Sequence, residues 1–177
     1  VGISILLFMT HSGTTWWQLT WALLYGVWLI IIKPASGTFM VSMQAMIGQF
    51  CALMALYLAW AGGPLYGLVF TTGLICYLAA RHFFDGFDEP YAKMVSYLWG
   101  YFGAALVWLL GHWLIFYHGI ISQPTLILST LGYGLAVLYY FDHASRLSNG
   151  LKRQFVFIMV AIIIVILTFS DWGDKVV

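Results

Sequence analysis

Hydrophobic runs of about 20 residues, separated by short polar breaks, make up most of this chain. The runs cover 16–32, 38–61, 65–84, 91–117, 125–141 and 154–170. A transmembrane helix needs about 20 mostly apolar residues to cross the hydrocarbon layer, and backbone groups in lipid must bond within the segment. The pattern therefore predicts an all-α membrane protein, a polytopic bundle of six transmembrane helices that forms a single integral domain over residues 1–177.

The apolar stretch 1–9 is too short to span a bilayer. We expect an extra short N-terminal segment there, either the end of a longer helix or a segment lying at the interface. Six spans place the chain before residue 16 and the C-terminal region on the same side of the membrane. The charge pattern predicts that this side is the non-cytoplasmic one.

The composition supports lipid as the main solvent of the chain. Only 7% of the residues are charged, against about 25% in soluble domains, and the mean hydropathy is +0.93. The net charge is +1, and the few bases are scattered, so no nucleic-acid partner is expected. Cys51 and Cys76 lie in apolar runs without a metal-type spacing, which argues against a disulfide framework.

The basic residues predict the orientation. Alternating spans put Lys33, Arg81, Lys93, Arg146, Lys152 and Arg153 on one face and only Lys175 on the other. Cytoplasmic loops carry the excess of Lys and Arg, so we expect loops 33–37, 85–90 and 142–153 in the cytoplasm. The expected location is the bacterial inner (plasma) membrane. Trp and Tyr residues near the opposite helix ends suggest an aromatic belt.

The loop around 81–93 gathers residues that are rare elsewhere in the chain. Histidine and carboxylate side chains there, together with a pair after the fifth span, suggest a metal site or a proton relay. The metal candidates are His82, Asp85, Asp88, Glu89, Asp142 and His143, and the catalytic candidates are His82, Asp85 and His143. Their spacing matches no metal motif. The plainer interpretation is a charged loop and a helix start, so we assign neither a metal nor a catalytic set.

Polar residues at membrane depth are few. No Asp, Glu, Lys or Arg lies at membrane depth, because Arg81 and Lys93 are at the ends of their predicted spans. This argues against a proton-driven pump. Gln44 and Gln49 need bonding partners in lipid, so we expect them to face the bundle interior, as interhelical contacts or ligand contacts. A bis-histidine haem needs a second histidine at the depth of His112. None is placed there, so a haem at His112 is not expected and no cofactor is predicted.

Two further features suggest contacts. The ligand-binding candidates combine the outer aromatic residues with the two amides and are Trp17, Gln44, Gln49, Trp60, His112 and Trp113. An aromatic belt explains the outer residues equally well. On the fourth span, Ser96, Gly100, Gly103, Val107 and Gly111 form a stripe of small residues that permits close helix packing, either within the bundle or against a partner subunit. The sixth span has almost no small residues and is expected to be the most lipid-exposed span or a flat apolar contact for another protein.

Three functions remain open. The first is a small non-catalytic subunit or binding component of a larger membrane complex, transport-type or other, with membrane protein partners or copies of itself. The second is a sensory or ligand-receptor domain with an outer aromatic pocket. The third is a membrane enzyme that uses the cytoplasmic His/Asp/Glu cluster, although catalytic sets need a convergent geometry that two loops do not guarantee. A non-catalytic role is the main expectation.

Overall fold

A computed structural model describes residues 1–33, 37–60, 63–112, 117–118 and 121–170. For residues 117–118 only the course of the backbone is described. Within these ranges, six helical segments are long and apolar enough to cross a membrane, which confirms the predicted span count. They are α2 (Thr15–Val27) continued by the π-helical turn η1 (Trp28–Ile32), α3 (Thr38–Ala59), α4 (Leu65–Phe84), α5 (Ala92–His112), α6 (Gln123–His143) and α7 (Asn149–Phe169). The chain is an integral membrane protein of the polytopic helical class.

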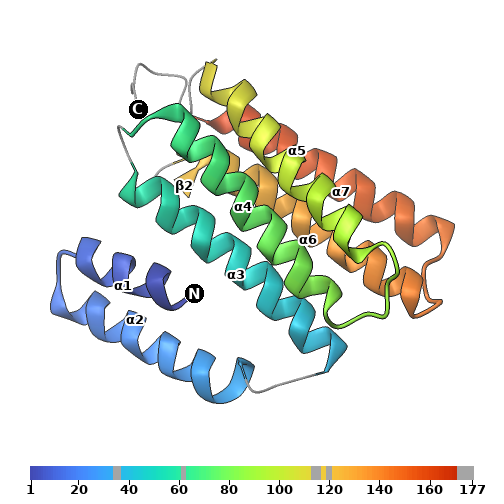
Figure 1. Cartoon of the computed structure of the whole chain (residues 1–177), viewed down its shortest axis with the longest axis horizontal. Coiled ribbons are helices and arrows are strands. Elements are labelled where there is room, and N and C mark those ends of the chain that lie inside the picture. Colours follow the sequence, from blue (N-terminus) through green and yellow to red (C-terminus); the bar gives the residue numbers. More distant parts are fainter. Residues whose placement is uncertain (34–36, 61–62, 113–116, 119–120, 171–177) are drawn as a thin grey trace.

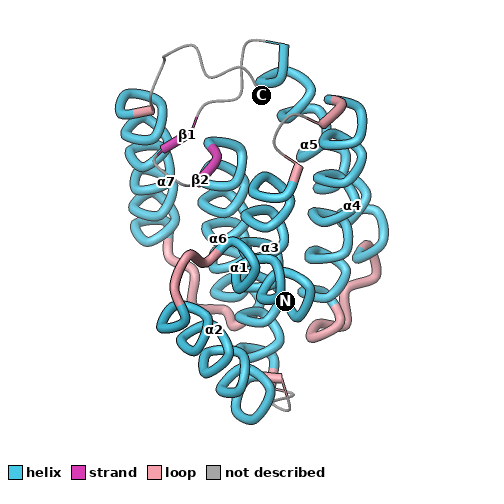
Figure 2. Tube along the Cα trace, turned by 90° about the vertical axis from the view of Figure 1, so that its left-hand side faces the viewer, coloured by secondary structure: helices cyan, strands magenta, loops and turns pink. Residues whose placement is uncertain are grey.

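Two predicted boundaries were wrong. The fourth span was expected to reach residue 117, but α5 ends at His112, and Tyr117–His118 form the two-residue strand β1. This strand pairs antiparallel with β2 (Ile121–Ser122), directly before α6. A helix over 91–117 would be about 40 Å long, more than the hydrocarbon layer requires. Figure 2 shows both strands at the end of the bundle where α6 begins.

The last span also begins earlier than expected. Asn149 and Gly150 were interpreted as part of a loop, but they form the first turn of α7. The Ser148 hydroxyl caps this helix by accepting a hydrogen bond from the Leu151 backbone N–H at 3.2 Å. The connection after α6 is therefore shorter than the predicted 142–153, and it turns at Ser145, whose φ is 53°.

The tightest helix pair is α4 with α5. A Cβ atom at Gly100 would lie 2.9 Å from the Gly73 carbonyl oxygen, and one at Gly103 would lie 2.7 Å from the Cys76 sulfur. The predicted small-residue stripe is buried at Ser96, Gly100, Gly103 and Val107. The stripe therefore packs inside the bundle, and the alternative of a partner docking there is wrong.

The helices form a core with two flanks. In Figure 1, α3, α4, α5 and α6 lie side by side, and α7 packs along α6 on one side. On the other side, the ten-residue helix α1 (Gly2–His11) and α2 form a hairpin beside α3. Ile5 and Phe8 of α1 pack with Ala55 of α3, so the short N-terminal segment lies against the bundle. The last helix buries only Met159 and Ile166. It is not the most exposed span, although that was expected, because α2 with η1 buries none of its residues.

The polar connections share one end of the bundle. The start of α3, the link from α4 to α5 and the link from α6 to α7 lie together in Figure 1. These connections carry the described residues of the predicted cytoplasmic loops. The arrangement agrees with the alternation on which the orientation was based.

Candidate functional site: a cavity among four helices

The side chain of Gln49 joins three helices in the middle of the core. Its Nε2 donates to the Leu128 carbonyl oxygen on α6 at 3.1 Å, and its Oε1 accepts from Nε1 of Trp99 on α5 at 3.1 Å. The residue is 6% exposed. Both ends of the amide are satisfied, which is what a polar group at this depth requires. The sequence predicted that Gln49 faces inward but did not predict Trp99 as its partner.

Next to this amide lies a cavity of about 290 Å³ with walls from α3, α4, α5 and α6. Small residues make the space, since Ala45, Ala79, Ala80, Gly132 and Ala136 all contribute to the wall. The volume is about twice that of an engineered apolar cavity large enough for benzene. The cavity is large enough for a small apolar molecule or part of a lipid.

Aromatic residues close the cavity toward the charged end of the bundle. Phe83, Phe84 and Tyr139 line this part and pack edge to face. Phe87, from the link after α4, packs on the same Tyr139 ring. The Tyr139 hydroxyl donates to Oε2 of Glu89 at 2.6 Å, which ties the link to α6.

The cavity opens sideways, between α5 and α6. Its wall residues there are also on the outer surface of the helices: Val95 is 39% exposed, Leu135 49% and Tyr133 53%. These two helices make few contacts with each other, whereas α4 and α5 pack closely. Since α5 and α6 are both spans, the opening faces the lipid-exposed side of the bundle.

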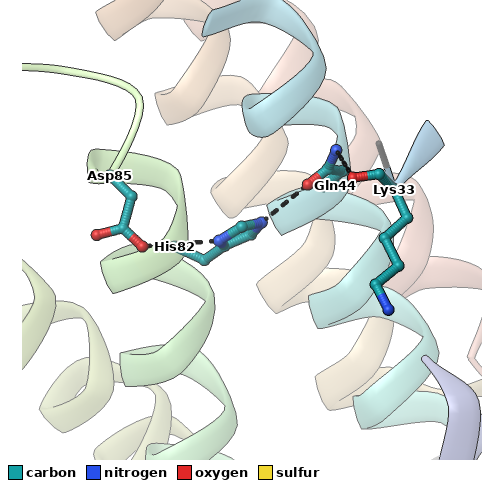
Figure 3. A network of polar contacts seen from close by, with 4 residues as sticks. All are labelled: Lys33, Gln44, His82 and Asp85. Atoms are coloured by element: carbon teal, nitrogen blue, oxygen red, sulfur yellow. Dashed lines mark hydrogen bonds and ion pairs between the residues drawn. The ribbon is translucent and has the colours of Figure 1, made fainter. Parts of the chain in front are cut away.

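A second hollow of about 210 Å³ lies against α3 and α4 and shares Ala45, Gln49 and Ala79 with the first. The polar residues Gln44 and His82 line it. Nε2 of Gln44 donates to the Ile32 carbonyl oxygen at 2.6 Å, so its Oε1 faces His82, whose Nε2 donates to it at 3.1 Å. Nε2 of Gln44 also lies 3.5 Å from the carbonyl oxygen of Lys33, directly after η1. Figure 3 shows the contacts from Lys33 through Gln44 of α3 to His82 of α4.

The chain of contacts continues to Asp85. Its Oδ2 lies 3.7 Å from Nδ1 of His82, one helical turn away. That distance suits an ion pair with a protonated ring but is too long for a hydrogen bond. Both side chains are largely exposed, at 47% for His82 and 62% for Asp85, so the pair is screened by water and contributes little to stability.

The metal candidates do not come together as one ligand set in the described part of the chain. The two loops do meet, because the His143 ring packs on Phe87 at 5.1 Å and on Tyr139 at 6.2 Å. Asp88 and Asp142 are exposed, however, and Glu89 is bonded to Tyr139. Among the described residues, no three His, Cys, Asp or Glu side chains are grouped so that they could hold a metal ion.

The predicted ligand residues are spread over the molecule. Gln44 and Gln49 line the two cavities. Trp17 is 61% and Trp60 38% exposed, and neither lines a cavity described above. The exposed His112 donates from Nδ1 to the Trp108 carbonyl oxygen at 2.8 Å. Trp113 lies outside the described residues.

Sequence reasoning missed the side chains that shape the cavity. Trp99, Ser129 and Tyr139 all line it, and each lies in a helix where the pattern looks uniformly apolar. One signal was present: a buried Gln in a membrane needs a donor on another helix, and Trp Nε1 is such a donor. Which Trp supplies it depends on helix register, which the sequence alone does not specify.

Comparison with known proteins adds no assignment, since no family model, curated protein or solved structure matches the chain.

Proposed function

We propose that this protein is a non-catalytic binding component of a larger membrane assembly, with transport as the leading process. The observation that carries the proposal is the cavity among α3, α4, α5 and α6, which is bordered by the Gln49–Trp99 bridge and opens toward lipid. Ligand sites are typically apolar hollows of about 300–1,000 Å³ with a few polar groups. The volume of this cavity, about 290 Å³, is just below that range.

A binding role agrees better with the lining than a catalytic one. None of the described residues that line the cavity is Asp, Glu, Lys, Arg, His or Cys. General acid–base and covalent catalysis usually rely on such groups. The described carboxylates, together with His82 and His143, lie outside it at the polar end of the bundle. The cavity therefore suits holding a molecule rather than transforming it.

The flanking helices support a role within an assembly. No residue of α2 or η1 is buried by the rest of the described chain, and α7 buries two. Both present apolar faces at membrane depth, where contact with lipid, another subunit or a second copy is possible. The short polar connections leave little aqueous surface for a partner, so we propose that partner contacts are made within the membrane.

We further propose the bacterial inner membrane as the location, with loops 33–37, 85–90 and 142–153 in the cytoplasm and both terminal regions on the other side. The support is the excess of Lys and Arg at that end. Trp16 and Trp17, 81% and 61% exposed at the start of α2, suit the opposite interface.

A sensory domain is the second candidate function, and the chain of contacts in Figure 3 favours it. The chain links the wall of the smaller hollow to the end of η1. A molecule bound in that hollow would contact both His82 and Gln44, which line it. A sensor predicts that an added ligand changes the position of η1 relative to α3, whereas a simple binding component predicts no such change.

Purification from native membranes in a mild detergent tests the main proposal. We expect a second membrane protein at a fixed molar ratio in the purified complex, measured by native mass spectrometry. The Ala105→Leu variant is the control for the purification, because Ala105 is exposed on α5 and lies outside the cavity. It should be purified with the same partner at the same molar ratio. A chain that is purified alone, with no partner protein, would contradict the proposal.

A further inference from the structure

The wall of the four-helix cavity contains a hydroxyl group that bonds to none of the described residues. Ser129 lines the cavity, and its Oγ is buried without a hydrogen-bond partner within the described structure. Other serines in these helices behave differently. The hydroxyls of Ser42 and Ser96 donate to carbonyl oxygens four residues earlier, at 2.8 and 2.7 Å, as is usual for helical serines. An unpaired buried hydroxyl costs free energy unless something bonds to it.

Most of the other polar groups of the lining are engaged, and the exception, the Tyr133 side chain, is 53% exposed at the opening. Gln49 and Trp99 bond to each other, and Tyr139 donates to Glu89. Ser129 is therefore the buried polar group of the lining that is left to bond to a molecule in the cavity. A hydroxyl can donate one hydrogen bond and accept others, so it suits a ligand with a hydroxyl or carbonyl group.

The lining also restricts the charge of the ligand. With no acidic or basic side chain among its described residues, a charged group inside would be desolvated without a counter-ion. That cost is several kcal/mol or more, about what is paid by unpaired charges in membranes. An uncharged molecule avoids this cost.

The position of the opening indicates the route of entry. The exposed wall residues Val95, Tyr133 and Leu135 lie on spans, while Phe83, Phe84 and Tyr139 close the end toward the charged connections. A molecule dissolved in the bilayer reaches the cavity directly, and a water-soluble one has to pass the aromatic closure.

We propose that the cavity binds an uncharged, bilayer-soluble lipid, whose apolar body enters between α5 and α6 and whose hydroxyl or carbonyl group bonds to Ser129. This inference rests on the proposed binding function and specifies its ligand class. In this proposal Ala136 lines the part of the cavity that the apolar body fills, and Ser129 recognises the polar group.

Photolabelling of the full chain in phosphatidylcholine nanodiscs tests the inference. Two probes share one alkyl chain with a diazirine group: a long-chain alcohol, which is neutral, and a long-chain sulfonate, which is permanently charged. We expect saturable labelling of the residues lining the cavity by the alcohol, at least tenfold above labelling by the sulfonate. Mass spectrometry of the labelled peptides identifies the site.

Three variants locate the ligand. Ala136→Leu fills the cavity and should lower saturable labelling at least tenfold. Ser129→Ala removes the hydroxyl and should weaken the apparent affinity for the alcohol about two- to tenfold, the range of one hydrogen bond. Ala105→Leu, on the outer face of α5, should change nothing. If Ala136→Leu does not fold, Ala80→Leu fills the same cavity from α4.

Equal labelling by both probes, non-saturable labelling, or labelling insensitive to the filling variants would overturn the inference. The measurement needs no partner protein. If the cavity is not labelled in nanodiscs but a partner protein still copurifies from native membranes, only the proposed ligand class is contradicted. Cavity labelling in a chain that has no native partner would support the ligand class and contradict the proposed assembly.

Discussion

Two spans of this protein, α2 with η1 and α5, are equally hydrophobic over their most apolar stretch and are packed very differently. The first buries none of its residues against the described chain. The second buries Ser96, Gly100, Gly103 and Val107 in a single stripe. Hydrophobicity places a helix in the membrane, since lipid tails are as apolar as leucine, but it does not select a neighbouring helix. Small residues at helical spacing make that selection.

The contrast can be tested most strongly at one glycine in each span. Gly100→Ala puts a Cβ atom 2.9 Å from the Gly73 carbonyl oxygen, a backbone atom that cannot move without shifting α4. We expect a loss of about 2–3 kcal/mol in the free energy of unfolding, the upper part of the range for overpacking. Reversible unfolding in mixed micelles with rising dodecyl sulfate measures it.

Gly26→Ala in α2 is the matched control. Nothing lies within 4 Å of a Cβ atom there, so alanine brings only its better helix propensity, up to about 1 kcal/mol in favour of the fold. Equal effects at the two glycines would mean that the α4–α5 seam does not decide the packing of the bundle.

The second prediction compares two glutamines. Gln49→Met removes the bonds to Trp99 and Leu128 with little change in volume. We expect a loss of about 1–2 kcal/mol, because hydrogen bonds between membrane helices contribute on this scale and the partners are left unpaired. Gln18→Met in α2 removes only a contact of 3.4 Å to the Met9 carbonyl oxygen and should change stability by less than about 0.5 kcal/mol.

A double-mutant cycle with Trp99→Phe assigns the effect. If Gln49→Met costs the same in the presence and absence of the Trp99 indole, then the two side chains are not coupled. The bridge would then not explain how α3 is held to α5.

The sequence predicted the spans because their cause is local. Hydropathy over about 20 residues decides whether a segment suits the bilayer, and no partner is needed for that. The stripe on α5 and the inward position of Gln49 were also predictable, since small and amide side chains gain nothing from facing lipid. The helix ends were less predictable. A cap such as Ser148 and a short strand pair such as β1–β2 lie outside the hydrophobic pattern.

The cavity was not predictable, and its residues explain why. It forms where Ala45 of α3, Ala80 of α4 and Ala136 of α6 come to the same depth. Each alanine alone is ordinary in a helix. Their coincidence depends on the register and tilt of helices that are distant in sequence, and the hydrophobic pattern does not specify either. The outer tryptophans, which are conspicuous in the sequence, were therefore named as ligand candidates, and Trp99 was not.

The third prediction concerns the bond that ties the end of the α2 span to α3. Gln44→Met removes the donor to the Ile32 carbonyl oxygen and the acceptor for His82. We expect backbone amides of 28–33 to exchange with deuterium about fivefold faster, the effect of losing about 1 kcal/mol. Ser42→Ala is the control, because its hydroxyl bonds only within α3, to Thr38. Unchanged exchange in Gln44→Met would show that η1 is held by other contacts.

The smallest effect is expected at a third glutamine, and its sign is informative. Gln123 is 1% exposed, yet neither atom of its amide has a hydrogen-bond partner in the described structure. Because Gln123→Met removes a buried polar group that is not bonded, it should leave the unfolding free energy within about 0.5 kcal/mol or raise it. Gln49→Met, the same substitution at a similarly buried site, should lower it. A loss at Gln123 as large as that at Gln49 would mean that the amide is bonded in the membrane-embedded protein, by water or by another molecule. Burial of an amide would then be no guide to its contribution, and bonding would have to be measured at each site.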